Sequence, residues 1–146
     1  MNTYSYNEIT IGQEESFTVK ITDADMEAFH KTTGDDNPLH CNAEYAMSRG
    51  YDGRLVYGML TASYLSTLAG MYLPGERSVI YEVEVKFIKP LVFQSNSNSN
   101  NNIKLTVCGK VAKKNDKFNR IIIKLTITNE DGEKVLRGTM KVGVAE

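Results

Sequence analysis

The hydrophobic pattern divides the chain into two parts that differ in period. From residue 78 onward apolar and polar residues alternate, which is typical of strands with one buried face. One face of the first such strand carries the apolar residues Tyr81, Val83, Val85 and Phe87. Further alternating runs at 103–113, 121–127 and 135–144 are separated by turn-forming residues and complete an antiparallel meander. An earlier run at 15–21 predicts one more short strand.

Two short helices are indicated by their end signals. Thr22 is a suitable N-cap for a helix over residues 23–33, which Gly34 can close as a C-cap. Asn42 likewise can cap a second helix over residues 43–48.

The longest uncharged stretch spans residues 55–75, after a polar loop at 51–54. It is nearly long enough to cross a bilayer, but its many small and polar residues fit a helix buried in protein better than a membrane span. We expect this helix to run from about 58 to 72 and to stop at Pro74. The strands that follow would cover it, so the fold class is α+β, with an antiparallel sheet around a central helix.

Size and composition fit a single domain, residues 1–146. The formal net charge of -1 gives no footprint for nucleic acid binding. Cys41 and Cys108 lack metal-ligand spacing, which predicts reduced thiols in a cytoplasmic protein and no metal site. Residues 1–12 are polar and show no signal-peptide core. The Asn- and Ser-rich stretch 94–102 is expected to be a flexible surface loop.

The strongest candidate for chemistry is a carboxylate and an imidazole five residues apart, Asp35 and His40. They stand on a turn that Pro38 prevents from staying helical. A nearby carboxylate can orient an imidazole and tune its basicity, which suits general acid–base catalysis. The same residues are compatible with a turn-forming Asp and a packed His. Cys41 is a weaker candidate nucleophile, because most free cysteines are small buried apolar residues.

Three motifs, in this order, resemble those of the MaoC-like dehydratases, a family that includes the (R)-specific enoyl-CoA hydratases. They are Gly-Asp-Asp-Asn-Pro-Leu-His at 34–40, Val-Tyr-Gly-Met-Leu at 56–60 and Phe-Ile-Lys-Pro-Leu at 87–91. The resemblance implies a hotdog fold, in which an antiparallel β-sheet wraps around a long central α-helix. It covers most of the chain and implies no cofactor.

The resemblance implies that Asp35 and His40 are the catalytic pair and that they hold and activate a water molecule. The family reaction adds water to a trans-2-enoyl thioester, or removes it from an (R)-3-hydroxyacyl thioester. The backbone N–H of Gly58 is expected to hold the thioester oxygen, because unpaired amides at a helix N-terminus favour negative charge. Ser66 matches a serine that faces the pair and could hydrogen-bond Asp35, although packing within a helix of small residues explains it equally well.

The expected substrate-binding residues are Gly58, Ser66, Asn37, Tyr57 and Met59. Of these, Asn37 is expected to hold the turn rather than to react, and its neighbour Asp36 to be solvated. Tyr57 stands where the family commonly has His, which would alter the pocket rather than the mechanism.

The leading hypothesis is a cytoplasmic hydratase or dehydratase, a lyase whose substrate is carried by coenzyme A or acyl carrier protein. We expect a homodimer or a larger oligomer, because a single copy would expose an apolar helix flank and a sheet edge. Two alternatives remain open: an acyl-thioester hydrolase, and a non-catalytic acyl-thioester binding module. The acyl-chain length and the physiological direction of the reaction also remain open. So does the pathway, for which fatty acid metabolism is one of several candidates.

Overall fold

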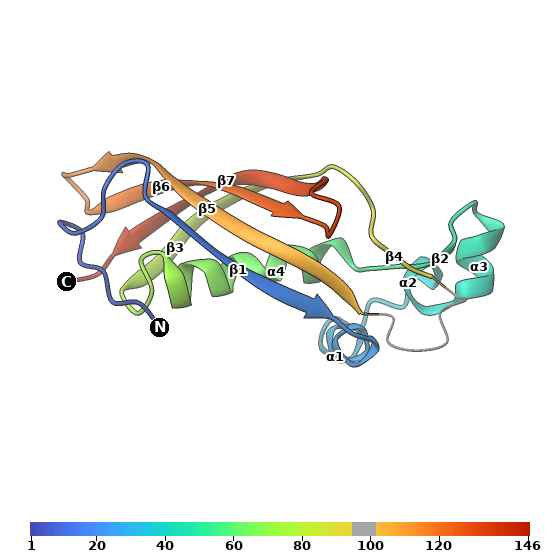
Figure 1. Ribbon diagram of the computed structural model, residues 1–146. Helices are drawn as coiled ribbons and strands as arrows, with labels where there is room; N and C mark the ends of the chain where they lie inside the picture. Colours follow the sequence, from blue (N-terminus) through green and yellow to red (C-terminus); the bar gives the residue numbers. More distant parts are fainter. Residues whose placement is uncertain (95–101) are drawn as a thin grey trace.

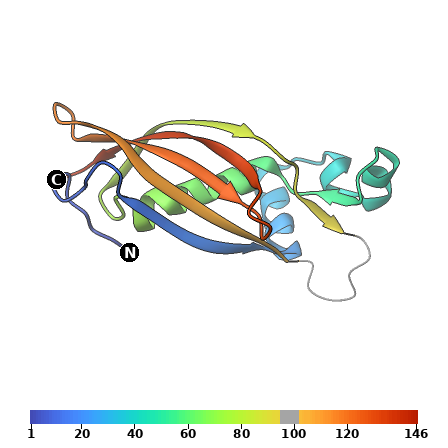
Figure 2. The ribbon, with the colours of Figure 1, turned by 45° about the horizontal axis from the view of Figure 1, so that its top comes forward.

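The computed structural model describes residues 1–94 and 102–146. Its main feature is a five-stranded antiparallel sheet with the order β1-β5-β6-β7-β3. Helix α4 (Gly58–Thr67) runs along one face of this sheet (Figure 1), and a turned view shows the sheet curving over it (Figure 2). The strands are β1 (Glu14–Ile21), β3 (Ser78–Phe87), β5 (Ile103–Asn115), β6 (Arg120–Thr128) and β7 (Lys134–Val144). Of the Asn- and Ser-rich loop expected at 94–102, residues 95–101 lie outside the described part of the chain, and Gln94 instead belongs to a short strand, β4 (Val92–Gln94).

The buried residues of the core follow the alternating pattern that the sequence predicts. On β6, the four residues at alternate positions are almost fully buried: Ile121, Ile123, Leu125 and Ile127. Gly109 of β5 allows the helical segment to approach closely, since a Cβ at this position would lie 2.7 Å from Leu68 and 2.9 Å from Ile123. The sheet therefore packs directly against the central helical segment.

The position of β3 in the sheet differs from the expected meander. Strands β5, β6 and β7 are sequential neighbours, but β3 pairs with β7, and β1 occupies the other side of β5. The connection after β3 forms β4 (Val92–Gln94), which pairs with β2 (Gly53–Leu55) in a separate two-stranded sheet. The chain thus leaves the main sheet before it returns as β5. The polar loop expected at 51–54 is wrong in part, because Gly53 and Arg54 belong to β2.

A bulge between Ile80 and Glu82 changes which side chains of β3 share a face. An extra residue in a strand interrupts the simple alternation of its two faces. Ile80 joins the apolar residues at 83, 85 and 87, which line one cavity. Tyr81 was expected on that face, but its ring instead lies beside Gly143 and 4.1 Å from the Arg120 guanidinium.

Helix α1 (Asp23–Thr33) has the predicted bounds and caps. The Thr22 hydroxyl accepts from the backbone N–H of Asp25, whose carboxylate accepts from the backbone N–H of Thr22. Gly34 ends the helix in the left-handed conformation, with φ 70°.

The turn after α1 contains a short helix that was not predicted, α2 (Pro38–Cys41). Asn37 caps it by accepting from the Leu39 amide, and Pro38 takes the first helical position, where its missing N–H costs nothing. Gly34 therefore ends α1, and Pro38 begins a new helix rather than only breaking the earlier one. The next helix, α3 (Ala43–Ser48), is confirmed, with Asn42 as its N-cap.

Helix α4 begins at Gly58 as predicted, but regular α-helical geometry ends at Thr67. A π-helical turn, η1 (Leu68–Tyr72), continues to the predicted end, where the Leu73 amide donates to the Leu68 carbonyl at 2.8 Å. The central helix is thus ten α-helical residues followed by one wider turn. Within residues 1–94 and 102–146, no helix has the length and apolar character needed to cross a membrane.

Candidate active site

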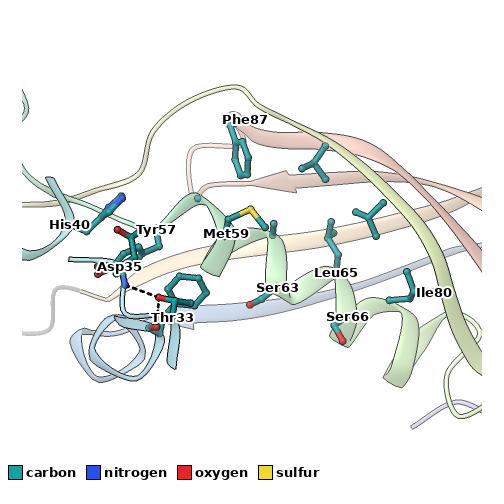
Figure 3. Close-up of a pocket in the computed structure, with 15 residues that line it drawn as sticks. Thr33, Asp35, His40, Tyr57, Met59, Ser63, Leu65, Ser66, Ile80 and Phe87 are labelled. Atoms are coloured by element: carbon teal, nitrogen blue, oxygen red, sulfur yellow. Dashed lines mark hydrogen bonds between the residues drawn. The ribbon is translucent and has the colours of Figure 1, made fainter. Parts of the chain in front are cut away.

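A cavity of about 800 Å³ opens between α4, β3 and the turn after α1 (Figure 3). Its polar end carries Asp35, His40 and Tyr57, together with the first residue of α4, Gly58. The remainder is mainly apolar, with lining side chains from α4 and β3 that include Met59, Leu65, Ile80, Val83, Val85 and Phe87. This arrangement suits a ligand with a polar group at one end and an apolar chain.

Asp35 is held at the polar end by local hydrogen bonds. Its backbone N–H donates to the Thr33 hydroxyl at 3.3 Å, and its carboxylate Oδ1 accepts from the backbone N–H of Asn37 at 3.1 Å. This is the side-chain turn that an Asp before Asn-Pro favours. Among the described residues the other carboxylate oxygen, Oδ2, has no hydrogen-bond donor, so it is available to a ligand or water.

The neighbouring Asp36 does not line the cavity. Its side chain is 86% exposed, as expected for a solvated residue, and its carboxylate contacts His30 Nε2 at 2.5 Å. This contact ties the turn to α1. Of the two adjacent carboxylates, only Asp35 is therefore placed for chemistry in the cavity.

His40 belongs to α2, and its ring is oriented by a backbone group. Nδ1 lies 2.9 Å from the carbonyl oxygen of Leu55. Because a carbonyl can only accept, Nδ1 carries the proton and the lone pair of the neutral ring lies on Nε2. Within the described part of the chain, no protein group hydrogen-bonds Nε2, so this nitrogen is free to accept a proton.

The expectation that a carboxylate orients the imidazole is not met. In the described residues no hydrogen bond joins Asp35 to His40: Asp35 Oδ1 accepts from the Asn37 amide, and His40 Nδ1 donates to the Leu55 carbonyl. The two side chains nevertheless line the same end of one cavity. Such a pair can act together through a water molecule that contacts both.

Gly58 opens α4 at the edge of this polar end. The first backbone N–H of α4 that takes part in a helical hydrogen bond is that of Thr61, which donates to the Tyr57 carbonyl. In the described structure no side chain caps this end of the helix. The amides at the start of α4 are therefore available to an anionic oxygen. A Cβ at Gly58 would lie 3.1 Å from the Phe87 ring, so glycine keeps the approach open.

The other expected binding residues differ in their positions. Met59 and Ser66 both line the cavity, but Figure 3 shows Ser66 farther along α4 than Ser63, away from Asp35. The expected hydrogen bond between Ser66 and Asp35 is not among those the described residues make. Asn37 is outside the cavity lining and caps α2.

Sequence reasoning missed several lining residues. Ala62 and Ser63 follow Met59 at spacings of three and four, so helical periodicity could have identified them with Ser66 as one face. The Leu55 contact is made by a backbone carbonyl and leaves no trace in the residue type. Ile80 was missed because a β-bulge cannot be read from alternation.

Comparison with known proteins adds three findings. Residues 7–126 match the family described as "MaoC like domain". An 86-residue stretch is 31% identical to the (R)-specific enoyl-CoA hydratase of Rhodospirillum rubrum, covering 59% of this chain and 60% of that protein. A 71-residue stretch is 37% identical to a mitochondrial 3-hydroxyacyl-(acyl-carrier-protein) dehydratase of Solanum lycopersicum, covering 49% and 43%. The matches thus span about half the length of these curated relatives.

Among solved structures, the unliganded R-hydratase PhaJ1 of Pseudomonas aeruginosa superposes with a TM-score of 0.86. The alignment covers 97% of this chain and 86% of that one, at 26% sequence identity. The hotdog fold expected from the sequence is therefore confirmed, and the departures in strand order and helix geometry described above lie within it.

Proposed function

The chain belongs to the family of MaoC-like domains, and on that basis we propose that it interconverts trans-2-enoyl and (R)-3-hydroxyacyl thioesters as a hydratase and dehydratase. The observation that carries this proposal is that Asp35, His40 and the N-terminus of α4 meet at the polar end of one otherwise apolar cavity. The names of the curated relatives support the same reaction class.

In the hydration direction, Asp35 and His40 together hold the water molecule. One O–H bond of water breaks as its oxygen bonds to C3 of the substrate, and the pair returns a proton to C2, so no net proton is consumed. The free lone pair on His40 Nε2 supports its part in this transfer, because its Nδ1 proton is already committed to Leu55. Dehydration follows the same path in reverse.

The thioester oxygen gains negative charge as water adds, and in this proposal the Gly58 amide stabilises it. A helix N-terminus favours that charge through its free amides and its dipole. Beyond it, Met59, Ser66 and the apolar side chains of β3 line the space proposed for the acyl chain. Asn37 contributes indirectly, by capping the helix that carries His40.

The carrier is coenzyme A or acyl carrier protein. Both are compatible with the relatives, of which one is named for a CoA thioester and another for an acyl-carrier-protein thioester. The proposal therefore rests on the thioester and the acyl group rather than on one carrier.

A homodimer is part of the proposal, because β3 is an edge strand with apolar side chains that a single chain leaves uncovered. These residues are between 39% and 56% exposed: Val79, Ile80, Tyr81, Val83 and Phe87. A long apolar edge strand is a surface that proteins usually cover. A second copy placed there would also close the open side of the cavity, which β3 borders.

The test is to mix the purified protein with crotonyl-CoA and follow the enoyl-thioester absorbance and the release of free thiol together. Hydration predicts loss of absorbance without thiol release, whereas a hydrolase on the same fold predicts release of free CoA. A binding module predicts neither, although the ligand would still bind. Crotonyl-acyl-carrier-protein, run in parallel, distinguishes a wrong carrier from a wrong reaction.

A further inference from the structure

Tyr57 lies against both members of the proposed catalytic pair (Figure 3). The residue is only 2% exposed, and its ring stacks on the His40 ring with 4.1 Å between centroids. On another side it contacts the Phe29 ring of α1 at 4.9 Å. Its hydroxyl donates to the backbone carbonyl of Asp35 at 2.9 Å. One buried side chain thus contacts His40 directly and holds the backbone of Asp35.

The Tyr57 hydroxyl keeps its proton to higher pH than an ordinary tyrosine, because its pKa is raised. Burial raises the pKa of the Tyr57 phenol well above its ordinary value, and the neighbouring Cys41 thiol and the Asp35 carboxylate raise it further. Because the Asp35 carbonyl can only accept, the phenol proton points to it. The Cys41 sulfur, 3.5 Å from the Tyr57 oxygen, can then donate to that oxygen.

The chain connects these contacts through one short segment. Leu55 at the end of β2 accepts from His40 Nδ1, Tyr57 follows two residues later, and Gly58 opens α4. The segment from 55 to 58 therefore contacts the His40 ring and the Asp35 backbone, and it supplies the amide proposed for the thioester oxygen.

We infer that Tyr57 is a positioning residue, which holds His40 by its ring and the Asp35 turn by its hydroxyl; this role rests on the proposed function. It does not react with the substrate. It keeps fixed the separation between the two groups that are proposed to hold one water molecule. Small errors in such a separation cost much of the rate.

Two variants separate the contribution of the Tyr57 hydroxyl from that of its ring. Tyr57→Phe keeps the ring and removes the hydroxyl, with its bond to Asp35 and its contact with Cys41, so we expect kcat per folded molecule to fall about tenfold while KM stays within about twofold. Amide hydrogen exchange over residues 35–40 should rise about fivefold, the worth of one lost hydrogen bond. Tyr57→Leu removes the ring too, so kcat should fall about 100-fold and the His40 ring signals in NMR should shift as the ring current disappears.

Tyr64→Phe is the matched control, because Tyr64 is a half-buried tyrosine of α4, the helix that follows Tyr57, and does not line the cavity. It should leave kcat and the exchange over 35–40 unchanged. The inference is overturned if Tyr57→Phe keeps the wild-type kcat, or raises KM alone, or lowers the melting temperature without changing kcat per folded molecule. If the wild-type protein turns over no enoyl thioester, the proposed function fails, and the exchange measurement still decides the positioning: unchanged exchange in Tyr57→Phe refutes it.

Discussion

A single methyl group added at Gly109 should force the central helical segment away from the sheet. A Cβ there would lie 2.7 Å from Leu68 Cδ2 and 2.9 Å from Ile123 Cγ2. Both distances are far below the separation of about 3.5–4.0 Å at which carbon atoms pack comfortably. Because Leu68 is fully buried, its side chain can move away only against other atoms of the core.

The expected cost follows from this crowding. Overpacking of a core by one methyl group costs about 1–3 kcal/mol, so Gly109→Ala should lower the free energy of unfolding by about 2 kcal/mol. For a domain of this size, that corresponds to a fall in melting temperature of roughly 4–8 °C. Thermal unfolding followed by circular dichroism, at one fixed protein concentration, measures it.

Two further variants test the cause. Gly70→Ala in η1 is the control, since the nearest atom to its added Cβ would be Ser78 Oγ at 3.9 Å, and it should leave the melting temperature nearly unchanged. In a Leu68→Ala background the crowding Leu68 methyl groups are gone and only the Ile123 contact remains, so the additional cost of Gly109→Ala should shrink. An equal cost in both backgrounds, or no cost in the wild-type protein, would refute the packing explanation.

Three other predictions concern the site, the thiols and the edge strand. Gly58→Ala places a Cβ 3.1 Å from the Phe87 ring, so kcat/KM for crotonyl-CoA should fall about tenfold. Adding Phe87→Ala to the same chain should restore part of the lost kcat/KM, and full activity of Gly58→Ala alone would contradict this prediction. Cys41 is exposed, whereas burial raises the pKa of the Cys108 thiol and keeps it protonated to higher pH. Mass spectrometry should therefore find iodoacetamide on Cys41 first and on Cys108 only as the pH rises, and the reverse order would contradict this prediction. Val79→Glu places a charge on exposed β3 and should shift sedimentation from dimer to monomer, and unchanged sedimentation removes this strand from the interface.

Features determined by neighbouring residues were predictable from the sequence. Thr22 begins α1 and Asn42 begins α3, because each side chain accepts from a free backbone N–H of the first helical turn. Gly34 ends α1, because glycine readily takes the left-handed conformation of a C-cap. The strands β5, β6 and β7 follow from alternation and short turns.

Features determined by contacts between distant parts of the chain were not predictable from the sequence. The edge position of β3 depends on its pairing with β7, which lies far away in the sequence, and the bulge at 80–82 leaves no signal in the alternation. The candidate pair Asp35 and His40 was identifiable from the motif that contains it, but the orientation of His40 was not. That orientation depends on a backbone carbonyl, which any residue at position 55 would supply.

The central claim is that Asp35, rather than the turn as a whole, takes part in adding water to the enoyl thioester. The most direct measurement compares crotonyl-CoA hydration by the wild-type protein, Asp35→Asn and Asp36→Asn. Asp36 is on the same turn but outside the cavity, so its variant controls for damage to the turn. The account predicts a loss of about 100-fold or more in Asp35→Asn and near wild-type turnover in Asp36→Asn. Equal activity of the two folded variants would contradict it.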